Sequence, residues 1–138
     1  MRFGVASCQN FTSGFYPAWR DLAATELDAV LFLGDYIYES GSKLGVRPDP
    51  IGTADTLDTY RAKYRLYRSD ADLRAAHAAH AFAPIWDDHE FLNNCSRGDN
   101  EADPARAAAA YRAWFEYQPV WPIDGTRTYR RVRFGDLA

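Results

Sequence analysis

Acidic and imidazole side chains follow two apolar segments of this sequence, and their types suit metal-assisted hydrolysis. The apolar run at residues 30–33 indicates a buried strand, and Gly34 lets the backbone turn so that Asp35 emerges at the carboxyl end. Ligands and metals gather at that edge of open α/β sheets. A carboxylate there can bridge two cations that share a water-derived nucleophile, whereas the plain alternative is an aspartate that caps a turn.

The second apolar segment, residues 80–86, is followed by a cluster of polar side chains: Asp87, Asp88, His89, Glu90, Asn93 and Asn94. One aspartate can point at a metal while His89 stays near the substrate and protonates the departing alkoxide. The alternative is a helix amino terminus, where acidic residues complement the dipole. Asn93 or Asn94 could give an amide oxygen to a hard cation such as Ca²⁺, or simply end the turn.

Two further residues become ligands only beside a cation. Cys8 ends the first predicted strand, where a thiolate would reach the same edge as Asp35; the alternative is a small buried hydrophobe. Tyr38 lies three residues after Asp35, and a phenolate binds only a strongly charged ion such as Fe³⁺; the alternative is packing. Cys8 and Cys95 are too few for a disulfide framework, although they could form one bridge.

Two other groups of residues favour structural roles. His77 and His80 are three residues apart on an alanine-rich helical segment, so zinc is possible, but a solvated face and a cation at the helix end fit better because no third ligand has matching spacing. Tyr60, Tyr64 and Tyr67 recur at helical intervals and indicate core rather than a stacking platform.

The elements that must position these residues predict an α/β fold with a mostly parallel sheet flanked by helices. A strand at 3–7, a helix from Pro17 to about residue 26 and a strand at 29–34 form a β-α-β unit whose strands end at one edge. Further helices are predicted at 56–68, 71–79 and 104–117, and strands at 80–86 and 128–134. Residues 96–103 are predicted as polar loop. The Gly-, Pro- and Ser-rich segment at 40–54 is interpreted as a lid over that edge.

The composition indicates one globular domain. The chain has 138 residues, a length that is small for a complete metal-dependent hydrolase. Of these residues 47% are hydrophobic, and the formal net charge is -3. We expect no membrane span, because no apolar stretch approaches bilayer length. We also expect no specific nucleic-acid partner, because the mild acidity provides no steering field. The four arginines between residues 127 and 133 are interpreted as a solvated strand face.

Four segments in this order resemble the PhoD-like alkaline phosphatase/phosphodiesterase family of the calcineurin-like metallophosphatase superfamily. They are Phe3-Gly4-Val5-Ala6-Ser7-Cys8-Gln9, Leu33-Gly34-Asp35-Tyr36-Ile37-Tyr38-Glu39, Asp58-Thr59-Tyr60-Arg61, and Trp86-Asp87-Asp88-His89-Glu90 with Asn93-Asn94. Any single motif would be weak, but the four together are specific. The final Phe134-Gly135-Asp136-Leu137-Ala138 resembles the start of that family's next core strand.

The resemblance implies a fold of two sheets packed between helices and a site that holds Fe³⁺ and Ca²⁺. Cys8 and Tyr38 match iron ligands, and Asp35 matches the bridging carboxylate. Asp88 stands in place of an asparagine ligand, and His89 matches the histidine that acts on the transition state. Asn93 or Asn94 is the other candidate for the calcium contact, and the choice among Asp87, Asp88 and the two asparagines stays open. The implied reaction is in-line attack of metal-activated water on a phosphoester substrate.

The resemblance also implies a partial fold. Residues 1–138 match the amino-terminal portion of the family's catalytic domain, and the second half, with a Gly-Asp-x-His segment and further ligands, is missing. We therefore expect the chain alone to be inactive. The alternative is a non-enzymatic remnant or interaction module that needs a partner chain to complete its core; a metal hydrolase acting on other esters is a third possibility. Met1 is followed almost at once by a strand, so we expect no signal peptide, although family members are often exported.

Overall fold

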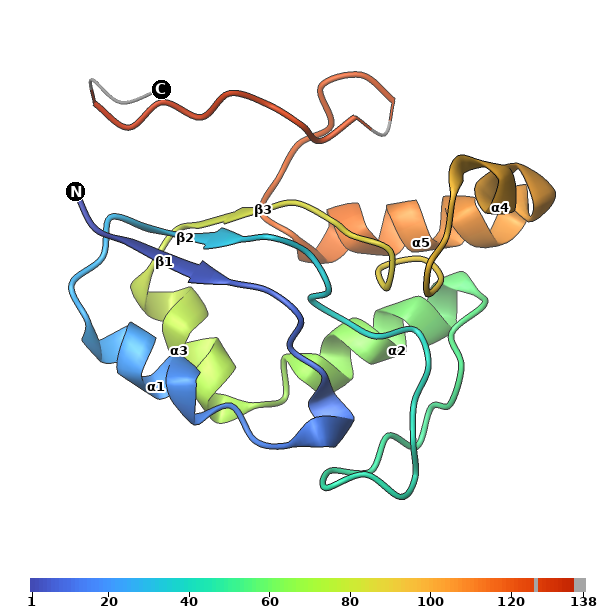
Figure 1. Ribbon diagram of the computed structural model, residues 1–138, viewed down its shortest axis with the longest axis horizontal. Helices are drawn as coiled ribbons and strands as arrows, with labels where there is room; N and C mark the ends of the chain where they lie inside the picture. Colours follow the sequence, from blue (N-terminus) through green and yellow to red (C-terminus); the bar gives the residue numbers. More distant parts are fainter. Residues whose placement is uncertain (126, 136–138) are drawn as a thin grey trace.

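Three parallel strands form the sheet at the centre of this computed structural model, which describes residues 1–125 and 127–135. The strands are β1 (Phe3–Ala6), β2 (Ala29–Phe32) and β3 (Phe82–Pro84), in the order β1-β2-β3 (Figure 1). Gly4 pairs with Val30, and Val30 pairs with Phe82. The α/β fold with a parallel sheet is therefore confirmed, and the carboxyl ends of all three strands meet at one edge. The third strand is shorter than the predicted 80–86.

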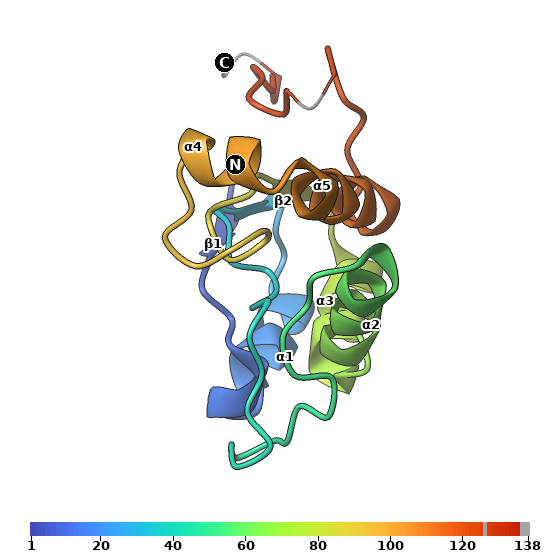
Figure 2. The same ribbon diagram turned by 90° about the vertical axis from the view of Figure 1, so that its right-hand side faces the viewer.

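The helices pack in two pairs. Helices α1 (Pro17–Ala24) and α3 (Ala71–Ala79) contact one another along one face of the sheet, and α2 (Leu57–Tyr67) contacts α5 (Pro104–Tyr117) (Figures 1 and 2). Local signals explain where they begin. Prolines open α1 and α5, Thr56 and Thr59 form a capping box before α2, and the Asp70 side chain caps α3. A short 3₁₀ turn, η1 (Phe11–Ser13), follows β1.

Aromatic side chains fill the core between the sheet and the helices. The three tyrosines of α2 are at most 1% exposed, so their predicted core role is confirmed.

The two histidines of the α3 segment differ from their predicted role in part. His77 does not lie on a solvated face. Its ring stacks on Phe82 with 3.8 Å between the ring centroids, and its Nε2 lies 2.8 Å from the Tyr36 hydroxyl. Burial, followed by the charge of Arg68, lowers the pKa of His77 to about 4. His80 does end its helix, where Nε2 lies 2.8 Å from the Leu22 carbonyl oxygen.

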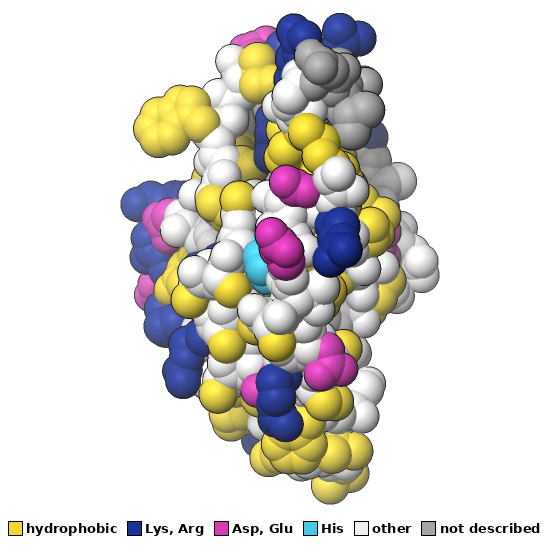
Figure 3. Space-filling model, turned by 90° about the vertical axis from the view of Figure 1, so that its left-hand side faces the viewer, with side chains coloured by type: hydrophobic (Ala, Val, Ile, Leu, Met, Phe, Trp, Pro, Cys, Tyr) yellow, Lys and Arg dark blue, Asp and Glu magenta, His cyan; other side chains and the backbone are white. Residues whose placement is uncertain are grey.

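Residues 96–103 are not the predicted loop. Arg97–Ala102 forms a short helix, α4, because Ser96 and Asp99 make a reciprocal capping box. Among the described residues no helix has both the length and the apolar character needed to cross a bilayer. On the face shown in Figure 3, basic and acidic side chains are interspersed with apolar ones.

The segment at 40–54 is irregular, as predicted, but it is anchored and does not act as a free lid. Lys63 Nζ lies 2.5 Å from Asp49 Oδ2, and these side chains are 0% and 1% exposed. A second buried ion pair joins Arg47 Nη1 to Asp70 Oδ2 at 2.6 Å. The Arg47 guanidinium also lies 3.9 Å from the centre of the Phe11 ring. Two buried charges therefore bind this segment to α2 and to the start of α3.

The outer face of the sheet, opposite α1 and α3, is apolar and only partly covered. Val5 is 61% exposed and Leu33 is 52% exposed. The predicted strand at 128–134 is wrong: within the described residues only Phe134 makes a bridge, and the segment runs as irregular chain beside this face (Figure 1). Its alternating pattern lacks a ladder because an extended segment needs a neighbouring strand to satisfy its backbone. Residues 136–138 of the predicted next strand lie outside the described residues.

Candidate metal centre

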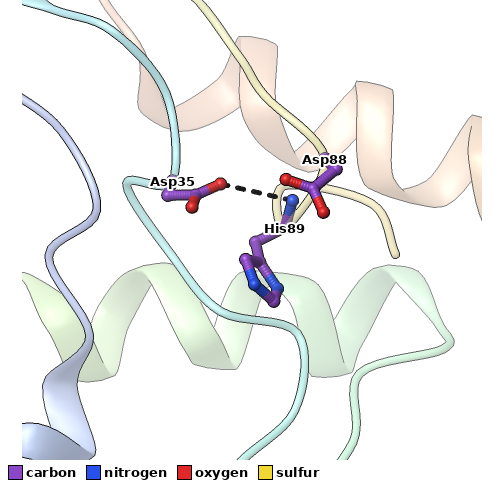
Figure 4. Close-up of side chains that lie close together, drawn as sticks. All are labelled: Asp35, Asp88 and His89. Atoms are coloured by element: carbon purple, nitrogen blue, oxygen red, sulfur yellow. Dashed lines mark hydrogen bonds between the residues drawn. The ribbon is translucent and has the colours of Figure 1, made fainter. Parts of the chain in front are cut away.

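Asp35, Asp88 and His89 converge at the carboxyl edge of the sheet. Asp35 follows β2, and the other two follow β3 (Figure 4). Each offers one ligand atom, and the three atoms lie within 4.8 Å of one another. The His89 backbone N–H also donates to Asp35 Oδ1 at 3.4 Å. The parallel pairing of β2 and β3 produces this convergence, because it brings the two following loops side by side.

The loop after β2 needs glycine at position 34. Gly34 has a φ of 100°, and a Cβ added there would lie 2.5 Å from the Asp87 Cβ. The next residue, Asp35, also adopts a left-handed φ, 55°, which non-glycine residues rarely do. The two loops are therefore in direct contact at the point where Asp35 turns toward Asp88.

Tyr38 contacts the Asp35 side chain, whereas Cys8 is exposed and contacts the same loop through its backbone. The Tyr38 hydroxyl donates to Asp35 Oδ2 at 3.2 Å, and the Cys8 backbone N–H donates to the Gly34 carbonyl at 3.1 Å. Burial raises the pKa of Asp35, and hydrogen bonds from the Tyr38 hydroxyl and the Cys8 thiol oppose that rise. Burial also raises the pKa of Tyr38, and the charges of Asp35 and Cys8 add to it. Cys8 has a φ of 57°, and both Cys8 and Cys95 are free thiols, so the bridge between them does not form.

The other polar residues of the loop after β3 do not all reach the cluster. Asp88 joins the cluster, and its Oδ2 accepts the backbone N–H of Asn94, whose φ is 55°. Asn93 is exposed, and its recorded contact is a backbone N–H that donates to Glu39 Oε1 at 3.1 Å. Asp87 is irregular and residues 88–90 form a bend and a turn, so the alternative of a helix amino terminus is wrong for this segment.

Glu39 was missed as a site residue by the sequence reasoning. It is 3% exposed, and its Oε2 lies 2.8 Å from His89 Nδ1. An ionised carboxylate only accepts hydrogen bonds, so Nδ1 carries the hydrogen and Nε2 faces away from Glu39. The His89 ring also packs on Tyr38, with 4.0 Å between ring centroids. The sequence did carry a signal for Glu39: this acidic residue lies four positions after Asp35, within an aromatic and apolar run.

Glu90 was also missed. Its side chain is fully buried and accepts three backbone N–H groups, those of Asp35, Tyr36 and Asp87, at 3.0, 2.5 and 2.8 Å. Burial raises the pKa of Glu90 to about 8, and the three N–H donors oppose that rise. The sequence offered no signal for these contacts, because they join two loops that meet only in the folded chain.

Comparisons with known proteins agree with this geometry. A family model described as PhoD-like phosphatase matches residues 3–138. The chain belongs to the PhoD-like phosphatase family. It is 41% identical to alkaline phosphatase D of Bacillus subtilis (strain 168) over 155 aligned positions, which cover 100% of this chain and 27% of that relative. A solved structure titled "Structure of PhoD" matches with a TM-score of 0.78 and 44% identity, covering 86% of this chain and 25% of that one. The chain thus spans about a quarter of the length of each relative.

The donors of this PhoD-like chain fit a cation. Burial raises the pKa of Asp35, the charge of His89 lowers it, and the negative charge of Asp88 raises it. A positive ion between the two carboxylates would offset their repulsion. Carboxylate oxygens suit hard cations, so the pair of aspartates fits such an ion.

Proposed function

We propose that this chain forms part of the site of a metal-dependent phosphoester hydrolase. The observation that supports the proposal most is the convergence of Asp35, Asp88 and His89 within 4.8 Å at the carboxyl edge of a parallel sheet. Membership of the PhoD-like phosphatase family supports the reaction class. The relative's printed name, alkaline phosphatase D, supports a phosphoester substrate.

The proposed cations are Fe³⁺ and Ca²⁺. Cys8 and Tyr38 would hold the ferric ion, Asp35 would bridge the two ions, and Asp88 with Asn93 would hold calcium. When bound, such a pair of cations supplies an activated water and offsets the charge that develops on phosphoryl oxygens. The chain itself holds the Asp35 carboxylate away from solvent: this residue is 6% exposed and accepts a hydrogen bond from the Tyr38 hydroxyl.

His89 is the proposed proton donor to the leaving group. Its Nδ1 is occupied by Glu39, so the ring presents Nε2 to an incoming molecule. In the imidazolium form, Nε2–H gives its proton to the departing ester oxygen as the phosphorus–oxygen bond breaks. Glu39 fixes the ring for this step, and Tyr38 packs against one face of the ring.

We further propose that these 138 residues alone do not catalyse. Among the described residues, the proposed ligands are Cys8, Asp35, Tyr38, Asp88 and Asn93. A calcium ion takes six to eight oxygens and a ferric ion several further ligands, so this set is too small for a complete pair of sites. The remaining ligands would come from residues beyond this set.

The test grafts this chain in place of the matching quarter of the Bacillus subtilis relative and measures hydrolysis of p-nitrophenyl phosphate and its bis ester. We expect the graft to hydrolyse the ester, and Asp35→Ala to reduce kcat at least ~100-fold, because it removes the carboxylate proposed to bridge both cations. Asp58→Ala is the matched control, since the Asp58 side chain is 92% exposed. Undiminished activity of Asp35→Ala would refute the proposed role of Asp35.

The alternative, a non-enzymatic module that needs a partner chain, is favoured by the open apolar face that includes Val5 and Leu33. Metal content separates the two proposals. Purified protein that contains iron and calcium and absorbs visible light through tyrosinate-to-iron charge transfer supports the hydrolase. Colourless, metal-free protein that binds a second chain supports the module.

A further inference from the structure

A single buried carboxylate joins the two loops that form the candidate metal centre. Glu90 Oε2 accepts the Asp35 N–H at 3.0 Å and the Asp87 N–H at 2.8 Å, while Oε1 accepts the Tyr36 N–H at 2.5 Å. The side chain is 0% exposed, so water does not compete for these donors. Glu90 therefore connects the loop after β3 to the backbone that carries Asp35.

The backbone at Asp35 requires such support. Its φ of 55° is unfavourable for a residue with a Cβ, so the surrounding contacts must hold it. Glu90 holds the N–H side of residues 35 and 36. Gln9 holds the carbonyl side: its N–H donates to the Asp35 carbonyl at 3.2 Å, and its Nε2 donates to the Tyr36 carbonyl at 2.9 Å. Gln9 is in turn fixed by Trp19 Nε1, which donates to Gln9 Oε1 at 2.9 Å.

The direction of the Asp35 side chain depends on this turn. The Asp35 carboxylate faces Asp88 and receives the Tyr38 hydroxyl only while residue 35 keeps its left-handed conformation. The ionised carboxylate is the form best suited to hold it, because both of its oxygens then accept and neither donates, and the same three N–H groups oppose the burial that raises the pKa of Glu90. An amide at the same place presents one NH₂ group to an N–H donor.

We propose that Glu90 is a positioning residue that acts through the backbone of Asp35 and fixes the turn that aims the Asp35 carboxylate at the cation site. It touches neither cation nor substrate in this arrangement. The consequence for metal affinity rests on the proposed function, whereas the consequence for the Asp35 backbone does not. Glu39 has a separate part, because it contacts the His89 ring and the Asn93 N–H rather than the Asp35 backbone.

The test compares Glu90→Gln with the unaltered protein by two measurements. Amide hydrogen exchange by NMR follows the Asp35 and Tyr36 N–H groups of this chain, and calorimetric titration with Ca²⁺ alone follows metal affinity in the graft described under Proposed function. We expect at least ~10-fold faster exchange at one or both amides and a Ca²⁺ dissociation constant raised about 10–100-fold, the usual effect of losing a partner of a metal ligand. Glu39→Gln is expected to leave both amides protected.

Two controls separate positioning from general stability. Glu101→Gln changes an exposed glutamate of α4, 68% exposed, and is expected to alter neither measurement. Leu73→Ala opens a cavity in α3, far in sequence from either loop, and is expected to lower the unfolding temperature while Ca²⁺ affinity is kept. If Glu90→Gln does not fold, the same two measurements are made on Glu90→Asp. This variant keeps both acceptor oxygens but places them on a shorter side chain.

Each result decides the proposal. Unchanged exchange at both amides in Glu90→Gln overturns it. Faster exchange with unchanged Ca²⁺ affinity also overturns it, since Glu90 would then support the fold and not the ligand. Absence of Ca²⁺ binding by the unaltered graft overturns the proposed function instead, and the exchange rates then still decide whether Glu90 fixes the turn at Asp35.

Discussion

Replacing Lys63 with methionine is expected to cost this protein a large part of its stability. The ammonium lies 2.5 Å from Asp49 Oδ2, and the two side chains are 0% and 1% exposed. After the change, the Asp49 carboxylate keeps one recorded donor, the Ile51 N–H at 2.9 Å, and stays out of water. Breaking a buried pair by removing one partner costs about 3–5 kcal/mol. Domains are stable by only about 5–15 kcal/mol, so this loss is between a fifth and all of the total.

Urea unfolding followed by circular dichroism gives the free energy of unfolding for the single variants and for the double variant Lys63→Met with Asp49→Asn. The double variant removes both charges, so we expect it to lose less than the sum of the two single losses. Arg97→Met is the control, because the Arg97–Glu101 pair is 94% and 68% exposed and is worth at most about 1 kcal/mol. A loss below about 1 kcal/mol for Lys63→Met would show that the pair is solvated and the reasoning wrong.

Two further predictions concern the glycine before Asp35 and the buried histidine His77. Gly34→Ala places a Cβ 2.5 Å from that of Asp87 at a φ of 100°, and it should cost at least ~3 kcal/mol, whereas Gly52→Ala, at a φ of 76° with nothing within 4 Å, should cost about 1 kcal/mol in urea unfolding. Because the His77 pKa falls from 6.5 unfolded to about 4 folded, its contribution is present above pH 6.5 and is lost as the pH falls toward 4. We expect about 2 kcal/mol of lost stability, discounted for partial exposure, and a flatter pH profile in His77→Asn; an unchanged profile would contradict this.

The convergence of Asp35 with Asp88 and His89 followed from the sequence because its causes are local. Apolar runs give strands, right-handed crossovers make them parallel, and parallel strands bring their following loops to one edge. The bounds of α3 and α5 were predictable for the same reason, since Asp70 and Pro104 mark where each begins. Features that depend on residues adjacent in the sequence can be predicted from the sequence.

The failures concern contacts between distant segments. The strand at 128–134 needed a neighbouring strand that the described residues do not supply, and the burial of His77 depends on Tyr36, which lies 41 positions earlier in the chain. Glu90 resembled any acidic residue of a turn, since its role depends on N–H groups more than 50 positions earlier in the chain. The missed α4 is different: its capping box was local and was overlooked.

Cys8, Asp35 and Asn94 all adopt a left-handed φ, of 57°, 55° and 55°. Glycine would adopt that backbone without the penalty of about 1 kcal/mol that a side chain incurs there. At Cys8 and Asp35, whose side chains are proposed ligands, selection for thermodynamic robustness and selection for the proposed chemistry therefore oppose one another. A lineage that no longer needed the proposed cation site would gain stability by replacing these two residues with glycine.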